Sequence, residues 1–183
     1  MELSKIIIAA VIIAFLAVIV YIIKTFNAFK FQAQEVERQK SGIEVALTTR
    51  YDTLVKLNKT VCGYTKHESG ALENVTKLRK GMSTEELSEA EARMSDAYSG
   101  LLALSESYPD LKASANFMQL QETIYDIENT LQAARRLYNE EVRIYNSMID
   151  SFPSCFIAPI ANASRVAYFE AEAHKRHDVE LEF

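Results

Sequence analysis

The fold is decided by residues 117–153, FMQLQETIYDIENTLQAARRLYNEEVRIYNSMIDSFP, in which apolar residues recur every three or four positions. This spacing places them along one side of an α-helix. Only Glu141 interrupts the series before Pro153 ends it. A seam of this length cannot stay in water, so it must pack against other helices at shallow crossing angles. The seam consists of Phe117, Leu120, Ile124, Ile127, Leu131, Ala134, Tyr138, Tyr145, Met148 and Phe152.

Two further long helices are expected upstream of this one. One apolar series runs from Ile43 to Tyr64 and continues the N-terminal apolar helix, with Ser41-Gly42 as its weakest point. Another starts at a capping box, Ser83-Thr84-Glu85-Glu86, and keeps heptad spacing until Pro109 closes the helix. Short helices are expected at 71–80 and at 166–169. The sequence therefore predicts an all-α fold, an elongated antiparallel up-and-down bundle of three long helices plus short ones, resembling a four-helix bundle.

The composition agrees with long helices and excludes one class of partner. The 183 residues include only 5 Gly and 3 Pro, and 25% are charged. A net charge of −5 with interspersed signs argues against a nucleic-acid binder. Cys62 and Cys155 lack a C-x-x-C spacing and are expected to be buried free thiols, although a disulfide stays open if the bundle is extracytoplasmic.

The stretch Ile6 to Ile23 is unbroken in its apolar character over 18 residues. As a helix it would be roughly 27 Å long, close to the hydrocarbon thickness of a bilayer. No small-residue cleavage site follows, so we expect the segment to be retained as a transmembrane helix that binds the lipid bilayer. Lys5 alone precedes it, whereas four Lys and Arg residues follow between 24 and 40. The positive-inside rule then predicts an outside N-terminus and a cytoplasmic bundle.

Three parts are expected: an anchor at 1–24, a helical bundle at 25–173 and a charged tail at 174–183. In the tail, His174 and His177 are expected to be solvated rather than to bind metal. His67-Glu68 is not a metalloprotease motif, because Ala71 stands where the second histidine of H-E-x-x-H would be. No catalytic residue, cofactor or metal is expected.

A second, partly polar stripe follows the apolar seam one position later, and Tyr138-Asn139 recurs one heptad on as Tyr145-Asn146. Two interpretations stay open: an interior hydrogen-bond network that sets helix register, or a polar groove for a partner or ligand. The candidate residues are Glu128, Arg135, Asn139 and Asn146. Arg50 falls in the apolar register of the first helix. It is therefore expected to be a buried charge, paired with Glu128 or another acid, because an isolated buried charge is costly.

Several longer motifs extend through nearly the whole chain. They are Phe26-Asn27 after the anchor, RYDTLVKL (50–57), GYTKHE (63–68), ENVTKLR (73–79), YPDLKASANFMQLQ (108–121), ARRLYNEEVRIYN (134–146), SFP (151–153) and YFEAE (168–172). On these motifs the chain resembles the LemA family of bacterial membrane proteins. It departs from the family at Phe26, often Tyr, and at Val55-Lys56, often Pro-Asn, which should leave the first helix straighter here.

The resemblance implies a left-handed helical bundle and no established activity, with family members often encoded near membrane proteases or other envelope proteins. We therefore expect a non-enzymatic scaffold or adaptor of the bacterial cell envelope, located in the inner membrane. An envelope protein, such as a membrane protease, is the expected partner, and a homo-oligomer stays open. The alternative is a small-ligand or lipid-binding module that uses a polar groove beside Arg135, Asn139 and Asn146. An enzyme is not expected, because no nucleophile is paired with a base.

Overall fold

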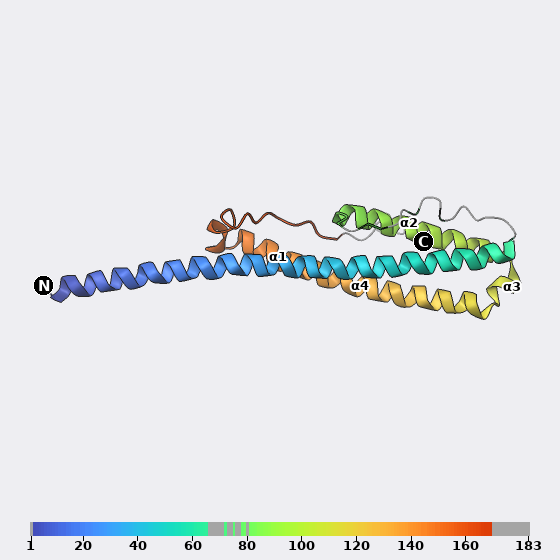
Figure 1. Ribbon diagram of the computed structural model, residues 1–183, viewed down its shortest axis with the longest axis horizontal. Helices are drawn as coiled ribbons and strands as arrows, with labels where there is room; N and C mark the ends of the chain where they lie inside the picture. Colours follow the sequence, from blue (N-terminus) through green and yellow to red (C-terminus); the bar gives the residue numbers. More distant parts are fainter. Residues whose placement is uncertain (1, 66–71, 73–74, 76–77, 80, 170–183) are drawn as a thin grey trace, which may run out of the picture. The chain divides into compact units, whose positions relative to one another are not determined.

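A computed structural model describes residues 2–65, 72, 75, 78–79 and 81–169 of the chain. These residues contain no strand. In this described part of the chain the elements are α1 (Glu2–Thr65), α2 (Thr84–Ser105), α3 (Pro109–Lys112), α4 (Ala115–Asp150) and the 3₁₀ turn η2 (Ser154–Phe156) (Figure 1). The prediction of an all-α helical bundle is confirmed.

The chain divides into two compact units, and both α1 and α4 contribute residues to each. The first unit comprises residues 1–38 and 140–167, and the second comprises 39–139 and 168–183. In the second unit most buried apolar side chains come from α1, α2 and α4, as the heptad spacing predicts, and Met82, Leu111 of α3 and Phe169 add to them. Its most deeply buried members are Ile43, Leu47, Leu54, Leu57, Val61, Leu87, Met94, Leu101, Leu111, Phe117, Ile124, Leu131 and Tyr138.

Within the second unit, α4 runs antiparallel to α1. Asn116, at the start of α4, donates a hydrogen bond from Nδ2 to Oγ1 of Thr60, near the end of α1, at 3.2 Å. Further along α4, Glu128 forms an ion pair with Arg50, which lies earlier in α1. The predicted antiparallel packing therefore holds for this helix pair.

The up-and-down order does not extend to α2, which runs parallel to α1. Leu87, near the start of α2, lines one cavity with Glu44 and Thr48, and Ser95 lies within 3.2 Å of the Arg50 guanidinium. Eighteen residues, 66–83, separate the two helices. When extended, these residues could span about 60 Å. The distance along α1 from Thr65 back to Glu44 is roughly 30 Å, so the connection is long enough for a parallel α2.

The helix expected at 71–80 is not found as a continuous element. Val75, Leu78 and Arg79 lie outside any helix. The Val75 N–H donates a hydrogen bond to Leu72 O at 3.1 Å, and residues 71, 73–74, 76–77 and 80 lie outside the described residues. Gly81 takes a φ of 84°, so the chain turns here in the left-handed region that glycine favours.

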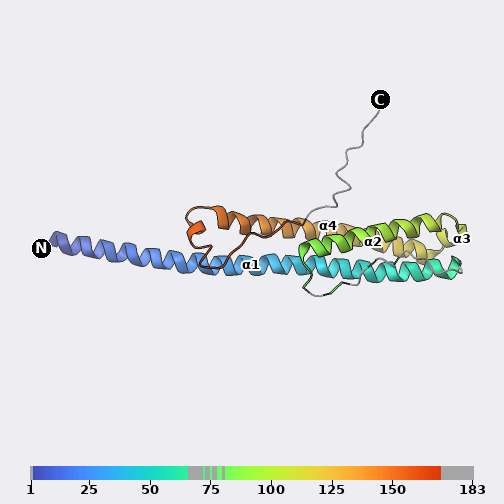
Figure 2. The ribbon, with the colours of Figure 1, turned by 90° about the horizontal axis from the view of Figure 1, so that it is seen from above.

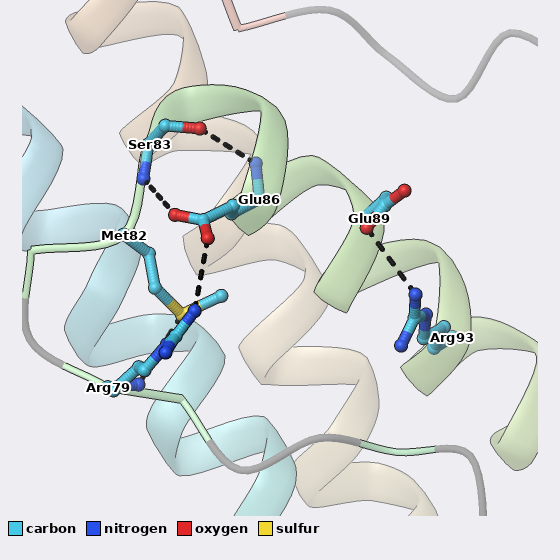
Figure 3. Close-up of polar contacts among 6 residues, drawn as sticks. All are labelled: Arg79, Met82, Ser83, Glu86, Glu89 and Arg93. Atoms are coloured by element: carbon cyan, nitrogen blue, oxygen red, sulfur yellow. Dashed lines mark hydrogen bonds and ion pairs between the residues drawn. The ribbon is translucent and has the colours of Figure 1, made fainter.

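The start of α2 confirms the predicted capping box (Figure 3). The Glu86 backbone N–H donates to Ser83 Oγ at 3.1 Å, and the Ser83 N–H donates to Glu86 Oε2 at 2.7 Å. These two bonds satisfy N–H groups that have no partner inside the helix. Arg79 adds an ion pair to Glu86 at 3.3 Å.

At Ser41-Gly42, the expected weak point of the first helix, α1 continues without a break. Ile43, directly after the glycine, is fully buried. Tertiary packing of the apolar face therefore outweighs the low helix propensity of a single glycine.

In the first unit, the end of α4 packs antiparallel against α1. The rings of Phe29 and Tyr145 meet edge to face with centroids 6.3 Å apart, and Gln32 Nε2 donates to the Glu141 carboxylate. Phe152, expected in the buried seam, is instead 81% exposed, since α4 ends at Asp150. Cys62 and Cys155 are thiols that form no disulfide, and they are partly buried, whereas buried thiols were expected.

The N-terminal part of α1 is exposed along its whole length. Residues 2–24 are all exposed, and Thr25 is the first buried residue. By length and composition α1 is the one helix among the described residues that could cross a membrane. Exposure of such an apolar stretch to water would be unfavourable, so it agrees with a bilayer around Ile6–Ile23.

Candidate functional site

The polar stripe of α4 lies on the side of the helix that faces the protein. Asn146 is buried, and Glu128, Arg135 and Asn139 are partly buried. Each follows an apolar seam residue by one position, which is about 100° around the helix. The stripe and the seam therefore share one broad buried face, and the polar side chains must find partners there.

Arg50 is buried in the second unit, with only 3% of its side chain exposed, and it forms an ion pair with Glu128. Its guanidinium also donates to the Ser95 hydroxyl at 3.2 Å and to the Glu91 backbone carbonyl at 3.4 Å. Among the described residues, Arg50 Nε is the buried side-chain nitrogen without a hydrogen-bond partner. One cation thus links α1, α2 and α4.

Burial around this pair also affects Tyr98. The pKa of the Tyr98 phenol is raised, chiefly because its half-buried position disfavours the phenolate. A hydrogen bond with Gln121 opposes this, the Glu128 charge raises the pKa further, and the Arg50 charge lowers it. Tyr98 therefore stays neutral beside the ion pair.

Arg135 forms a second ion pair in the same unit, to Glu91 of α2. The distance from Arg135 Nη1 to Glu91 Oε1 is 2.6 Å, and the Glu91 side chain is only 5% exposed. The sequence analysis missed Glu91, although a signal was present. Glu91 falls between Leu87 and Met94 at steps of four and three, so it sits in the apolar register of α2 as Arg50 sits in that of α1.

Asn139 uses its side-chain amide to bind the backbone of Phe169, also in the second unit. Its Nδ2 donates to Phe169 O at 3.0 Å, and the Phe169 N–H donates to its Oδ1 at 2.8 Å. A primary amide carries both a donor and an acceptor, so it can satisfy both polar groups of one peptide residue. The Phe169 side chain is buried.

Asn146 makes the same arrangement in the first unit, with Val166. Its Nδ2 donates to Val166 O at 2.9 Å, and the Val166 N–H donates to its Oδ1 at 3.0 Å. Each of the heptad-spaced asparagines therefore holds one residue of the segment after α4.

These contacts explain why the short helix expected at 166–169 does not form. Residues 164–169 have no regular secondary structure. In a helix the N–H groups would bond to carbonyls four residues earlier. Here the asparagine side chains take the N–H and C=O groups of Val166 and Phe169 instead, and the chain remains non-helical.

The arrangement leaves little polar capacity for a ligand among these residues. Both ends of the Asn139 and Asn146 amides are engaged, and Arg135 is paired. A surface cavity of about 320 Å³ does lie beside them in the second unit, lined by Gln132, Arg135, Arg136, Asn139 and Phe169. Whether the stripe also serves a partner or a ligand stays a prediction.

Within the described part of the chain, no cluster of three His, Cys, Asp or Glu side chains could hold a metal ion. His67, Glu68, His174, His177 and the charged tail at 174–183 lie outside the described residues. The described residues of the stripe thus present paired charges and satisfied amides.

An exposed apolar helix that runs on into a buried helical core defines a membrane-associated helical-bundle protein. Comparison with known proteins gives the particular family. The profile of the LemA family matches residues 39–183, and the chain belongs to this family.

Two curated relatives show how far the similarity extends. The chain is 30% identical over 159 residues to "Protein LemA" of Metamycoplasma hominis, a match that covers 84% of this chain and 73% of the relative. It is 20% identical over 195 aligned positions to "Magnetosome protein MamQ" of Magnetospirillum gryphiswaldense, covering 90% of this chain and 72% of that protein. The similarity thus includes most of each relative.

Proposed function

We propose that the protein is a non-enzymatic scaffold or adaptor that holds a helical bundle at a membrane of the bacterial cell envelope. The observation that carries this proposal is the continuity of α1, which runs unbroken from Glu2 to Thr65. The same helix supplies the exposed apolar span and deeply buried core residues such as Leu47 and Leu54. The helix that would cross the bilayer is thus also part of the core of the bundle.

The surface of α4 in the second unit offers a place for a partner. Met118 and Tyr125 lie one heptad apart and are 53% and 67% exposed. Exposed aromatic and Met side chains are enriched at protein interfaces. An envelope protein, such as a membrane protease, is the partner that a tethered adaptor would meet.

Site-specific photo-crosslinking in cells tests this proposal. A photoreactive residue at Met118 or Tyr125 is expected to give one defined adduct with another envelope protein. Thr123 and Thr130 provide matched controls, because they are exposed, also one heptad apart, and about 140° away around the same helix. No adduct at any site, or equal labelling at all four, would contradict an adaptor surface here. An adduct between copies of this chain would indicate a homo-oligomer instead.

We also propose that the N-terminus lies outside and the bundle in the cytoplasm. Lys5 precedes the span, whereas Lys24, Lys30, Arg38 and Lys40 follow it. Cys62 and Cys155 are thiols outside any disulfide and are partly exposed, so they report the side on which the bundle lies. A membrane-impermeant thiol reagent should label them in broken cells and not in intact ones. Labelling in intact cells would reverse the orientation.

A ligand-binding module is a second candidate, favoured by the cavity of about 320 Å³ beside Arg135 and Asn139. Arg136 lines this cavity and is exposed. Saturable binding of an anionic ligand, lost in Arg136→Ala at unchanged helicity, would support it. Arg136→Ala is a cleaner test than Arg135→Ala, which would leave the buried Glu91 carboxylate without its cation.

A further inference from the structure

The loop after α4, residues 151–160, contains both buried and strongly exposed apolar side chains. Ile157 and Ala158 are 4% and 3% exposed and pack against the first unit. Phe152, Phe156 and Ile160 are 81%, 70% and 63% exposed. The two phenylalanine rings contact each other edge to face, with centroids 6.0 Å apart. Two phenylalanine rings in contact at the surface, with the exposed Ile160 four residues further on, indicate a contact surface rather than scattered surface residues.

The loop is held in shape by its own hydrogen bonds. Backbone N–H groups of Cys155, Phe156, Ile157 and Ala158 all donate to carbonyls within the segment 151–154. The Ser154 hydroxyl donates to Met148 O at 2.7 Å, which ties the loop to the end of α4. Since these backbone groups are already satisfied, the loop could approach an apolar medium without the cost of bare polar groups.

The loop lies where α1 leaves the bilayer. Lys30 of α1 donates from Nζ to Ala161 O at 3.0 Å, directly after the loop. Lys30 is seven residues past Ile23, or about 10 Å along the helix. Figures 1 and 2 both show the loop, in red-brown, turning beside α1 near the point beyond which α1 continues toward the N-terminus without a neighbour. Burial along α1 accordingly begins at Thr25, two residues after the span.

We propose that Phe152, Phe156 and Ile160 insert into the headgroup boundary of the bilayer and form a second membrane contact beside the span. The interfacial layers add roughly 5–8 Å to each side of the hydrocarbon core, so a loop at the end of the span meets them. Aromatic side chains favour this layer. Lys24 and Lys30, one and seven residues past Ile23, can meet anionic headgroups. The proposal rests on the membrane location and not on the scaffold role.

The chain contains no tryptophan, so a single introduced tryptophan is a clean depth probe. The full-length protein would be reconstituted at low density in vesicles of phosphatidylcholine and phosphatidylglycerol, with bromine placed near to or far from the headgroup. Emission from Phe152→Trp and from Phe156→Trp is expected to be roughly halved by the shallow bromines and little changed by the deep ones. The reason is that interfacial side chains lie about 5–10 Å into the headgroup boundary.

Two control sites on α1 distinguish a failure of the loop contact from a failure of the membrane anchor. Phe15→Trp, within the span, should be quenched by the deep bromines, and Glu37→Trp, about 21 Å past Ile23, by neither. Unquenched, water-exposed emission at 152 and 156 with normal quenching at 15 would overturn the loop contact and leave the anchor intact. Unquenched emission at 15 would refute the anchor itself. Emission that is shielded from water but depends on protein density and not on bromine would mean that a second copy covers the loop, which also overturns the proposal.

Discussion

Arg50 is buried more deeply than Glu128 in their ion pair. We therefore expect the loss of free energy of unfolding to depend on which of the two charged side chains is removed. Arg50 is 3% exposed and Glu128 is 30% exposed. Glu128→Ala would leave a buried cation and should lower the free energy of unfolding by about 3 kcal/mol. Arg50→Met would leave a carboxylate that water can reach, and it should cost about 1 kcal/mol. Denaturant unfolding of the full-length protein in mild detergent measures both.

The double substitution sharpens this test. With both charges gone, the cost should return close to that of Arg50→Met, because no unpaired buried charge remains. Arg93→Ala, which breaks an exposed pair with Glu89, serves as the control and should cause no measurable change. Equal effects of Glu128→Ala and Arg50→Met would show that burial does not govern this pair.

Asn146 can form both hydrogen bonds with Val166 because its side chain is an amide and not a carboxylate. Asn146→Asp keeps an acceptor for the Val166 N–H but loses the donor to Val166 O and places a negative charge beside that carbonyl. We expect residues around Val166 to lose at least about 1 kcal/mol of protection in amide hydrogen exchange. Asn27→Asp, at an exposed position of the same unit, should leave this protection unchanged. Unaltered exchange in Asn146→Asp would mean that the amide does not hold the segment.

At the scale of the elements, two glycines should respond in opposite directions to the same change. Gly42 lies inside α1 with nothing within 4 Å of an added Cβ, so Gly42→Ala should stabilise the protein by about 0.5–1 kcal/mol. Gly81 also has open space but a φ of 84°, so Gly81→Ala should cost about 1–2 kcal/mol. Thermal unfolding followed by circular dichroism compares the two. A stabilising Gly81→Ala would show that the turn relaxes to another conformation.

The long helices could be predicted from the sequence because each carries its own local signal. Heptad spacing marks the buried faces of α1, α2 and α4, and the capping box at Ser83 marks the start of α2. The direction of α2 could not be predicted, since it depends on how the 18 residues before it return, and no local interaction encodes that path. The buried charge of Arg50 could be anticipated from its register, and the same reasoning applied to Glu91 would have found the partner of Arg135.

The asparagine repeat was visible in the sequence, but its partners were not. Asn139 and Asn146 bind backbone atoms of Phe169 and Val166, and a backbone group carries no residue-specific pattern. The apolar character of residues 166–169 suggested a helix. The spacing of apolar residues does not show that side-chain amides compete with the helix for the backbone N–H and C=O groups. The exposure of Phe152 was missed for a similar reason: it continues the spacing of the seam although the helix has already ended at Asp150.

For the whole molecule, the main energetic question is what covers residues 2–24 of α1. The apolar side chains of residues 6–23 are all exposed in the structure, whereas burial begins at Thr25. Fully burying one large aliphatic side chain is worth roughly 1.5–3 kcal/mol, so leaving this many in water would be very unfavourable. A bilayer supplies the missing apolar surroundings along the length of one span.

Charges at the centre of the span should therefore release the protein from the membrane. Ala14→Arg with Phe15→Arg would disfavour insertion by about 5–7 kcal/mol, since each arginine at a helix centre costs about 2.5–3.5 kcal/mol. We expect the doubly substituted protein to appear in the alkaline carbonate extract, whereas the original protein stays in the pellet. Met118→Arg with Tyr125→Arg adds the same charge at exposed positions of α4 and should stay in the pellet. Because carbonate also removes peripheral contacts such as that proposed for residues 151–160, a doubly substituted span that still pelleted would contradict anchoring by α1.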